Sequence, residues 1–369
     1  MNPFRYGQVV SRDFYCPRSD LEAVLTEKIR SCQNILVNGE RRIGKTSLVL
    51  RAVESTKNFK VLYVDLLEVK TIEDIHKRFL NAMLRYENKS QLLQNMLKKM
   101  ASLRPVVTFD ALSGLPSVSL DSSADYKPDS LDGLLGLLEE SAFSRAVVVI
   151  DEFQDVLNCS EKRQILAIMR GRIQFLTKTP FIFSGSVRNA MEDIFNDPQS
   201  PFFKSALTVA VGPINHLDFR NFIEKRFASA GLKLSVDLLE KIFTVAGENT
   251  GDIQQFCSAL FDVADKKSIT TEATLNEALT YIFAQEQKGY ESTLTLLTAI
   301  QLKCLSAVAR LGGSGVLARA FLAATGIRQP STVKKSLERL CDVRILFRMN
   351  GVYRFVNPYF GKWLVWRNF

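Results

Sequence analysis

Residues 39–46 constrain the fold more than any other stretch, because they read Gly-Glu-Arg-Arg-Ile-Gly-Lys-Thr and match G-x-x-x-x-G-K-[ST] in full. The motif follows an apolar run at 34–39 and opens a helical pattern at 45–56, so it joins a predicted buried strand to a predicted helix. Its glycines allow successive N–H groups to converge on one anion, and the helix N-terminus adds a positive dipole end. The stretch therefore predicts a phosphate-binding loop.

Two side chains of this loop have individual predicted roles. Lys45 can reach the β- and γ-phosphates of a nucleoside triphosphate, and the Thr46 hydroxyl can bind Mg²⁺. The sequence thus predicts ATP and Mg²⁺ as cofactors. The predicted nucleotide-binding residues of the loop are Gly39, Glu40, Arg41, Arg42, Ile43, Gly44, Lys45, Thr46 and Ser47.

A second motif supplies the acids that such a loop needs. Residues 146–152 read Ala-Val-Val-Val-Ile-Asp-Glu, an apolar run followed at once by two carboxylates. The end of a buried strand beside the loop is where a P-loop protein holds its metal carboxylate. We expect Asp151 to bind Mg²⁺, usually through water, and Glu152 to act as the general base for the attacking water. The alternative is a strand that ends in two solvated acids.

A third candidate element is the apolar run 180–186, which reads Pro-Phe-Ile-Phe-Ser-Gly-Ser. From the end of an adjacent strand, Ser184 and Ser186 can sense the γ-phosphate or the attacking water. We therefore include both among the candidate catalytic residues, with Lys45 and Glu152. Two small hydroxyls at a strand end are equally typical of an ordinary loop.

The order of the elements predicts the fold class. Helical patterns alternate with short apolar runs that lack period-two alternation, as expected of strands buried on both faces of a parallel sheet. This order predicts a three-layer αβα P-loop domain over residues 1–215. Residues 106–130 interrupt it, and their alternating ends around Ser113-Gly114 predict a β-hairpin and linker insertion. The apolar runs lie at 34–39, 60–66, 146–152, 180–186 and 207–213.

Beyond residue 215 the strand-like runs stop and helical patterns dominate. Residues 216–295 predict a helical lid domain, and the pattern at 271–311 reads as one long connecting helix. Residues 296–369 then give a short helix, a turn, a second helix at 331–343 and two strands joined by Asn350-Gly351, a strong hairpin signal. This order predicts a winged helix-turn-helix domain.

The positive charge of the chain is concentrated at this end. Residues 301–369 hold twelve Lys or Arg and two acids, so their net charge is +10. The net charge of the whole chain is +9, so residues 1–300 carry −1. The asymmetry predicts a polyanionic partner, most simply double-stranded DNA, although a basic solubilising face has the same composition. The candidate DNA-contacting residues are Lys334, Lys335, Arg339, Arg348 and Arg354.

Three absences in the sequence bear on the compartment. There is no run of about 18 uncharged apolar residues of the kind that spans a bilayer. The first residues lack the basic-then-apolar order of a secretory signal, and the six cysteines are scattered without a CxxC pair. The sequence predicts a cytoplasmic protein without a membrane partner.

Four stretches together carry a resemblance to a known family: "RRIGKTSL", "VVVIDEFQ", "FIFSGS" and "YRFVNPYFGKWL". They resemble an ATPase family known mainly from archaea and found also in bacteria. That family lies within the AAA+/STAND group of P-loop ATPases and is similar to the origin-recognition ATPases in joining an ATPase module to a winged helix. The resemblance covers nearly the whole chain and implies an αβα domain, a helical lid and a C-terminal winged helix.

The resemblance also implies roles that residue spacing does not assign. The stretch 16–25, with Arg18, resembles the element that packs beside the adenine, and 184–186 resembles the sensor-1 strand. Residues 250–254 fall where related proteins contact the γ-phosphate from the lid, but Gln254 stands where a basic residue is expected. Lys204 stands where relatives often carry an arginine, and lysine lacks the planar two-pronged contact. We expect slow or partner-stimulated hydrolysis.

Two functions from different classes fit these features. The first is an ATP-binding and ATP-hydrolysing switch whose basic winged helix binds DNA. The alternative is a STAND-like regulatory ATPase whose winged helix makes protein–protein or autoinhibitory contacts, with a protein partner or a homo-oligomer. The apolar tail with Trp363 and Trp366 favours docking of some kind, or completes the winged-helix core. A small-molecule kinase fits poorly, because nothing resembles an acceptor site.

Overall fold

The computed structural model describes residues 1–10, 12–86, 105–109, 116–120, 128–185, 188–264, 272–349 and 351–369. These residues form two compact units. We call Pro17–Gly212 the sheet unit, and Met1–Cys16 together with Pro213–Phe369 the helical unit. The chain passes between the units at Cys16–Pro17 and again at Gly212–Pro213. The predicted three-domain boundaries at residues 215 and 295 stay predictions.

The sheet unit is built on five parallel strands in the order β2-β5-β6-β1-β7. Except for β5 and β6, neighbouring strands are not consecutive along the chain, and the parallel strands are joined by crossover connections. Each strand lies within one of the predicted apolar runs, so this prediction is confirmed. The strands are β1 (Ile35–Gly39), β2 (Lys60–Asp65), β5 (Ala146–Asp151), β6 (Phe181–Gly185) and β7 (Leu207–Val211).

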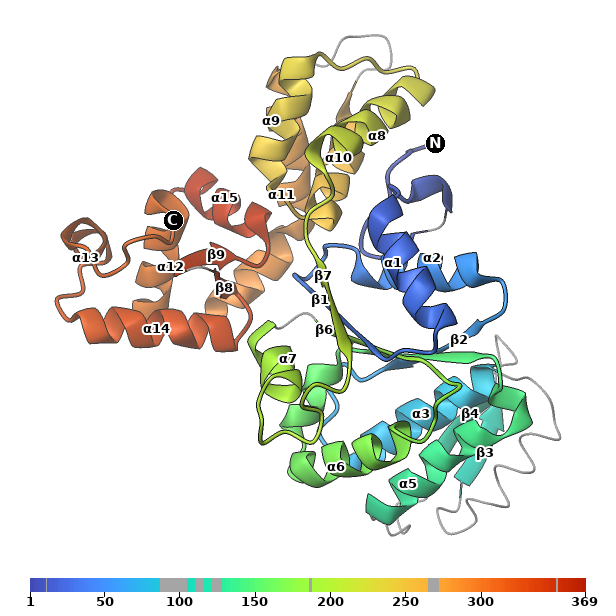
Figure 1. The fold of residues 1–369 in the computed structure, drawn as a ribbon. Coiled ribbons are helices and arrows are strands. Elements are labelled where there is room, and N and C mark those ends of the chain that lie inside the picture. The colour runs from blue at the N-terminus through green and yellow to red at the C-terminus, as the bar shows by residue number, and fades with distance from the viewer. Residues whose placement is uncertain are drawn as a thin grey trace. The chain divides into compact units, whose positions relative to one another are not determined.

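Helices cover both faces of this sheet (Figure 1). One face carries α1 (Ser19–Arg30) and α2 (Lys45–Thr56). The other carries α3 (Ile72–Tyr86), α5 (Pro128–Gly136) and α6 (Lys162–Ile173). Strands β5 and β6 are buried at every position, which explains their lack of alternation. The predicted three-layer αβα fold class is confirmed.

The predicted insertion contains a two-stranded antiparallel sheet. Strand β3 (Pro105–Phe109) pairs with β4 (Pro116–Leu120), with Val107 opposite Val118. The predicted turn at Ser113-Gly114 lies outside the described residues. In the same unit, α7 (Arg188–Phe195) follows β6.

After Gly212 the helical unit continues with α8 (His216–Ser229), α9 (Val236–Ala246) and α10 (Thr250–Val263). The first residues of the chain complete its core, because the Phe4 ring packs 4.6 Å from that of Phe227. Asn2 Nδ2 donates to the carbonyl and hydroxyl oxygens of Ser258 at 3.0 and 2.9 Å. Residues 1–16 therefore belong to the core of the helical unit.

The single long helix predicted at 271–311 is wrong, because the structure has two helices there. They are α11 (Glu272–Thr295) and α12 (Ala299–Leu311). Thr298 caps α12 in a capping box, in which its hydroxyl accepts from Gln301 N and its own N–H donates to Gln301 Oε1. The cap starts a new helix, so the pattern breaks at 296–298.

The winged helix follows in the expected order. After α12 come α13 (Arg319–Thr325), α14 (Pro330–Asp342), the antiparallel strands β8 (Leu346–Met349) and β9 (Val352–Phe355), and α15 (Pro358–Trp366). Asn350, the first residue of the predicted turn, lies outside the described residues.

A third segment completes the winged-helix sheet, because Gly313 bridges Tyr353 of β9. A Cβ atom at position 313 would lie 1.8 Å from the Tyr353 oxygen, so only glycine allows this approach.

Candidate functional site

The phosphate loop has the backbone geometry that the motif predicts. Gly44 has φ +94° and is the N-cap of α2, a conformation that glycine adopts without strain. Arg42 also has a positive φ, of +63°. At the start of the loop, a Cβ atom on Gly39 would lie 2.5 Å from the Val211 oxygen. Both glycines of the motif are therefore required by the local geometry.

Lys45 is buried and curls back on the loop. Its Nζ donates to the carbonyl oxygens of Gly39 at 2.9 Å and Glu40 at 2.8 Å. Burial lowers the pKa of Lys45, while the nearby charges of Glu152 and Asp151 act in the opposite sense. The loop thus encloses a cation at its centre.

Asp151 ends β5 and receives two hydroxyl groups on one carboxylate oxygen. Thr46 Oγ1 donates to Asp151 Oδ2 at 2.9 Å, and the Tyr63 hydroxyl donates to the same atom at 2.6 Å. The structure therefore brings the two predicted metal ligands together. Hydroxyl and carboxylate oxygens are the ligands that Mg²⁺ prefers, so this donor set fits that ion.

Tyr63 was not among the predicted site residues, and it lies on β2 opposite Val149 of β5. Burial, and then the charge of Asp151, raises the pKa of the Tyr63 hydroxyl, so this group remains a donor. Tyr63 lies two residues before Asp65, the residue that pairs with Asp151, so both side chains belong to the same face of β2. The β2–β5 register is therefore needed to identify Tyr63.

Glu152 is held by a neighbour that sequence reasoning missed. Gln154 is buried, and its Nε2 donates to Glu152 Oε2 at 2.5 Å and to Asp155 Oδ1 at 3.2 Å. A Cβ atom on Gly185 of β6 would lie 2.4 Å from Gln154 Oε1, so the glycine makes room for this amide. The predicted general base is thus oriented by an amide that lies against the end of β6.

An aromatic cluster fixes the turn that carries Glu152. Glu152 itself has φ +50°. The next residue, Phe153, packs its ring 4.8 Å from Phe183, 5.3 Å from Phe202 and 5.9 Å from Phe195. Such packing holds the backbone of Glu152 in a conformation that is otherwise uncommon for this residue type.

Ser184 lies in β6 between β1 and β5, where it is 1 % exposed. Its Oγ makes no hydrogen bond within the described part of the chain, and neither do Asn38 Oδ1 of β1 or Gln154 Oε1. Three buried oxygens at the carboxyl end of the sheet thus keep hydrogen-bonding capacity. Ser186, the other predicted serine, lies outside the described residues.

Arg18 and Lys204 occupy different surroundings in the sheet unit. Arg18 is 9 % exposed and donates from Nη2 to Ile43 O at 2.6 Å and from Nη1 to Gly212 O at 2.5 Å. Lys204 is exposed, has φ +50°, and its Nζ lies 5.2 Å from the centre of the Phe203 ring. Their predicted roles toward nucleotide stay predictions.

Gln254 belongs to the helical unit. It is 4 % exposed, and its Nε2 donates to the Phe14 oxygen at 3.3 Å. The side chain contacts the N-terminal segment of its own unit, and its predicted role at the γ-phosphate stays a prediction.

Helices α10 and α11 share a polar cluster with α15 that the sequence did not indicate. Both oxygens of Glu286 on α11 accept hydrogen bonds, Oε1 from Gln255 of α10 at 2.5 Å and Oε2 from Asn357 at 2.8 Å. Asn357 is the N-cap of α15, and the Tyr359 hydroxyl after it donates to Asp252 O at 2.6 Å. Helices α10, α11 and α15 are therefore tied by directed bonds within one unit.

The five predicted DNA-contacting cations are all exposed on the winged helix. On α14, Lys334 Nζ lies 3.8 Å from Glu338 Oε1, and Arg339 Nη1 lies 3.7 Å from Asp342 Oδ2. The Arg348 guanidinium lies 5.5 Å from the centre of the Tyr353 ring. These ion pairs are solvated and weak, so the cations remain able to contact an anionic partner.

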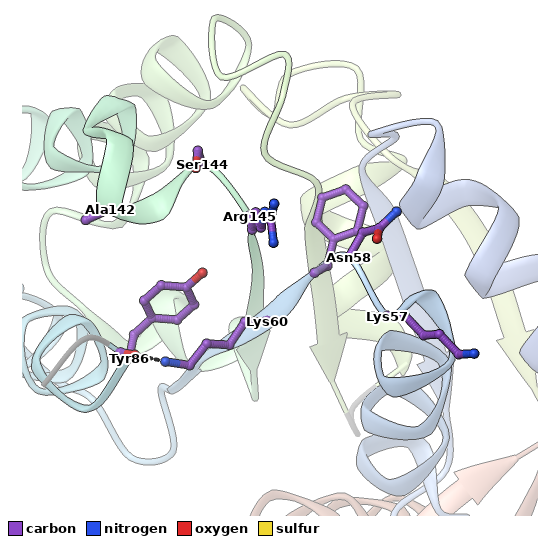
Figure 2. Close-up of a pocket in the computed structure, with 8 residues that line it drawn as sticks. Lys57, Asn58, Lys60, Tyr86, Ala142, Ser144 and Arg145 are labelled. Atoms are coloured by element: carbon purple, nitrogen blue, oxygen red, sulfur yellow. Dashed lines mark hydrogen bonds between the residues drawn. The ribbon is translucent and has the colours of Figure 1, made fainter.

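A separate basic cavity of about 310 Å³ lies where β2 and β5 begin, at the opposite ends of the strands from the phosphate loop. Figure 2 shows residues that line it. Lys60 begins β2 there, beside Arg145, and its Nζ lies 4.4 Å from the centre of the Tyr86 ring. None of the predicted site residues lines it. Its lining residues are Lys57, Asn58, Phe59, Lys60, Tyr86, Ala142, Ser144 and Arg145.

Comparison with solved structures agrees with this architecture. The Walker-type ATPase of Pyrococcus abyssi superposes with a TM-score of 0.66 at 19 % identity, over 96 % of this chain and 97 % of that one. This chain has the fold of a Walker-type ATPase. The ORC2 protein of Aeropyrum pernix in its ADP form gives a TM-score of 0.51 at 15 % identity, over 99 % and 98 % of the two chains.

Sequence comparisons add the identity of the C-terminal part. Residues 288–366 match the family described as "Probable winged helix domain". The curated proteins give no match to the chain. Within the described residues, no helix combines the length and apolar character needed to cross a membrane.

Proposed function

We propose that the chain is an ATP-binding and ATP-hydrolysing switch whose winged helix binds double-stranded DNA. The observation that carries the nucleotide part is the hydrogen bond between Thr46 of the phosphate loop and Asp151 at the end of β5. It joins a loop that binds phosphate to a carboxylate that suits Mg²⁺, at the carboxyl edge of a parallel sheet, where such folds bind ligands.

The residues of the loop would bind the triphosphate. Lys45 would exchange its bonds to the loop carbonyls for the β- and γ-phosphates, and the N–H groups at the start of α2 would face the phosphate oxygens. Thr46 and Asp151 would hold Mg²⁺, which supplies charge neutralisation on the phosphates when bound.

Glu152 would accept a proton from water as the water oxygen attacks the γ-phosphorus and the bond to the ADP oxygen breaks. The products are ADP and inorganic phosphate. Gln154 would keep the Glu152 carboxylate in place through the bond to Oε2. A tightly held base, and a lysine rather than an arginine at position 204, favour slow turnover that a partner accelerates.

DNA binding is supported by the exposed cations of α14 and of the β8–β9 wing. In a winged helix the second helix of the helix-turn-helix enters the major groove, and here that helix is α14. Lys334, Lys335 and Arg339 would contact phosphates or base edges, with Arg348 and Arg354 on the wing.

The tail of the winged helix favours a second candidate function, a STAND-like regulatory ATPase with a protein partner. Trp363 is buried in the winged-helix core, but Trp366 is 54 % exposed and Val365 is 45 % exposed. Exposed tryptophan is enriched at protein–protein interfaces. A protein that docks on α15 would give the winged helix a role other than binding DNA.

ATP turnover with and without duplex DNA tests the nucleotide part of the proposal. We expect the wild-type chain to bind ATP and release phosphate, and Lys45→Ala to lose both activities because the loop loses its central cation. Equal phosphate release by the two proteins would refute the assignment.

A gel shift at rising salt tests the DNA part. Each lost phosphate contact should reduce the salt slope by about one, so Lys335→Ala should bind duplex more weakly and with a shallower slope than wild type. Lys233→Ala is the matched control, because Lys233 is an exposed lysine between α8 and α9, outside the winged helix. Absence of retardation at low salt would favour the protein-docking candidate.

A further inference from the structure

The two places where the chain passes between its units share one chemical feature. Each connecting peptide bond leads into a proline, Cys16–Pro17 on the way into the sheet unit and Gly212–Pro213 on the way out. Proline fixes φ and has no N–H group, so both connectors have restricted backbones. The Gly212 carbonyl oxygen is then the one hydrogen-bonding group of its peptide bond.

Arg18 lies one residue after the first connector and binds the second. Its Nη1 donates to Gly212 O at 2.5 Å. The backbone N–H of Arg18 donates to Glu22 Oε1 at 2.9 Å, which fixes the start of α1. The side chain is 9 % exposed, so these bonds form largely out of water. Arg18 therefore holds the last peptide of the sheet unit to its first helix.

The same guanidinium also binds the phosphate loop. Arg18 Nη2 donates to Ile43 O at 2.6 Å, and the next residue, Gly44, is the N-cap of α2. A trans peptide is planar, so its C=O and the following N–H point in opposite directions. When Arg18 fixes the Ile43 carbonyl, it also fixes the direction of the Gly44 N–H, one of the donors that the loop offers to phosphate.

We infer that Arg18 is a positioning residue that couples phosphate binding at the loop to the two connectors of the chain. This inference rests on the proposed nucleotide function. A phosphate that accepts a hydrogen bond from the Gly44 N–H reorients the Ile43–Gly44 peptide. The Arg18 guanidinium, which is bonded to Ile43 O and to Gly212 O, then shifts the Gly212–Pro213 peptide. Arg18 acts in this way through backbone carbonyls, a role distinct from contact with the adenine.

Arginine suits this role because its rigid, planar group offers separate nitrogens to the two carbonyls. Lysine at the same position has one nitrogen on a flexible stem. Arg18→Lys keeps the charge and about the same length, so it should preserve folding while the shared geometry is lost. This makes it a sharper test than removal of the charge.

Hydrogen exchange measured by mass spectrometry tests the coupling in the full-length chain. ADP with Mg²⁺ is the probe, and peptides that cover 12–22 and 209–218 are the readout. In wild type we expect nucleotide to slow exchange in both peptides, by roughly fivefold or more if the coupling is of ordinary size. In Arg18→Lys and Arg18→Met we expect that response to be lost, with nucleotide affinity reduced by less than about tenfold.

Arg30→Lys is the matched control, because Arg30 is an exposed arginine of α1, the helix that follows Arg18. It should keep the wild-type response, and circular dichroism should show that Arg18→Lys is folded. Failure of wild type to bind ADP overturns the proposed function itself. ADP binding without a response in the connector peptides overturns only the coupling, as does a full response in either Arg18 variant.

Discussion

The carboxyl edge of the sheet and the junction of α10, α11 and α15 both bury polar side chains, but they use their hydrogen bonds differently. At the junction, both oxygens of Glu286 accept bonds from side chains of its own unit. At the sheet edge, oxygens of Asn38, Gln154 and Ser184 make no bond within the described part of the chain. A buried oxygen without a partner costs stability, so it is retained where a ligand or water can use it. We therefore expect a ligand or water to use the oxygens at the sheet edge, whereas Glu286 acts as a structural brace between helices.

The largest expected effect is on the rate of phosphate release, in a variant that keeps the shape of the site at the sheet edge. Glu152→Gln should keep nucleotide affinity but lower phosphate release about 100-fold or more, because the amide cannot accept the proton from water. Single-turnover phosphate release beside a nucleotide-binding titration measures the two quantities. Equal turnover in wild type and variant would remove Glu152 from its assigned role.

At the brace the expected loss is in stability. Glu286→Ala should lower the free energy of unfolding by about 2 kcal/mol, since it removes a charged acceptor shared by Gln255 and Asn357. Nucleotide affinity should not change. Thermal and urea denaturation measure the loss, with Gln285→Ala on the exposed face of α11 as the control. Equal stability of the two variants would contradict the distinction between brace and site.

A smaller effect of opposite sign is expected at the sheet edge. Ser184→Ala should raise the free energy of unfolding by up to about 1 kcal/mol, because it removes a buried hydroxyl without a partner, and it should slow phosphate release. Ser205→Ala is the matched control, since Ser205 Oγ donates to Phe202 O at 2.7 Å and its loss should destabilise. A destabilised Ser184→Ala variant with normal turnover would mean that this hydroxyl is structural.

The smallest effect concerns pH. Burial lowers the pKa of Lys45 in the folded chain, so the unfolded chain binds more protons between that lowered pKa and the ordinary value of 10.5. Stability should therefore rise with pH across this window in wild type, relative to Lys45→Met, which has no such group. Urea denaturation of both proteins at several alkaline pH values measures the difference, and parallel curves would show that the ammonium is not penalised by burial.

The phosphate loop, the acids after β5 and the winged-helix order were predictable because each depends on residues close together in the chain. Local apolar periodicity and the positions of glycines predict a strand, a loop and a helix in that order. The sequence also contains a signal for the break before α12, since Thr298 and Gln301 have the spacing of a capping box.

Tyr63, Gln154, Glu286 and the contacts of Arg18 were not predictable, because each depends on a long-range pairing. Tyr63 can donate to Asp151 because β2 lies beside β5 in the sheet. The order of the strands in the sheet differs from their order in the sequence. Glu286 has no distinctive sequence context on α11, and its role depends on where α10 and the α15 cap meet it.

The packing of Phe4 against Phe227 has a consequence for how the chain emerges during synthesis. The sheet unit is one continuous stretch, so all of its strands are available once residue 212 has been made. The helical unit combines the first sixteen residues with everything after Gly212, and its core closes only when the late helices can receive Phe4. The sheet unit can therefore fold on the ribosome before α8 and α10, which contact residues Phe4 and Asn2, have been made.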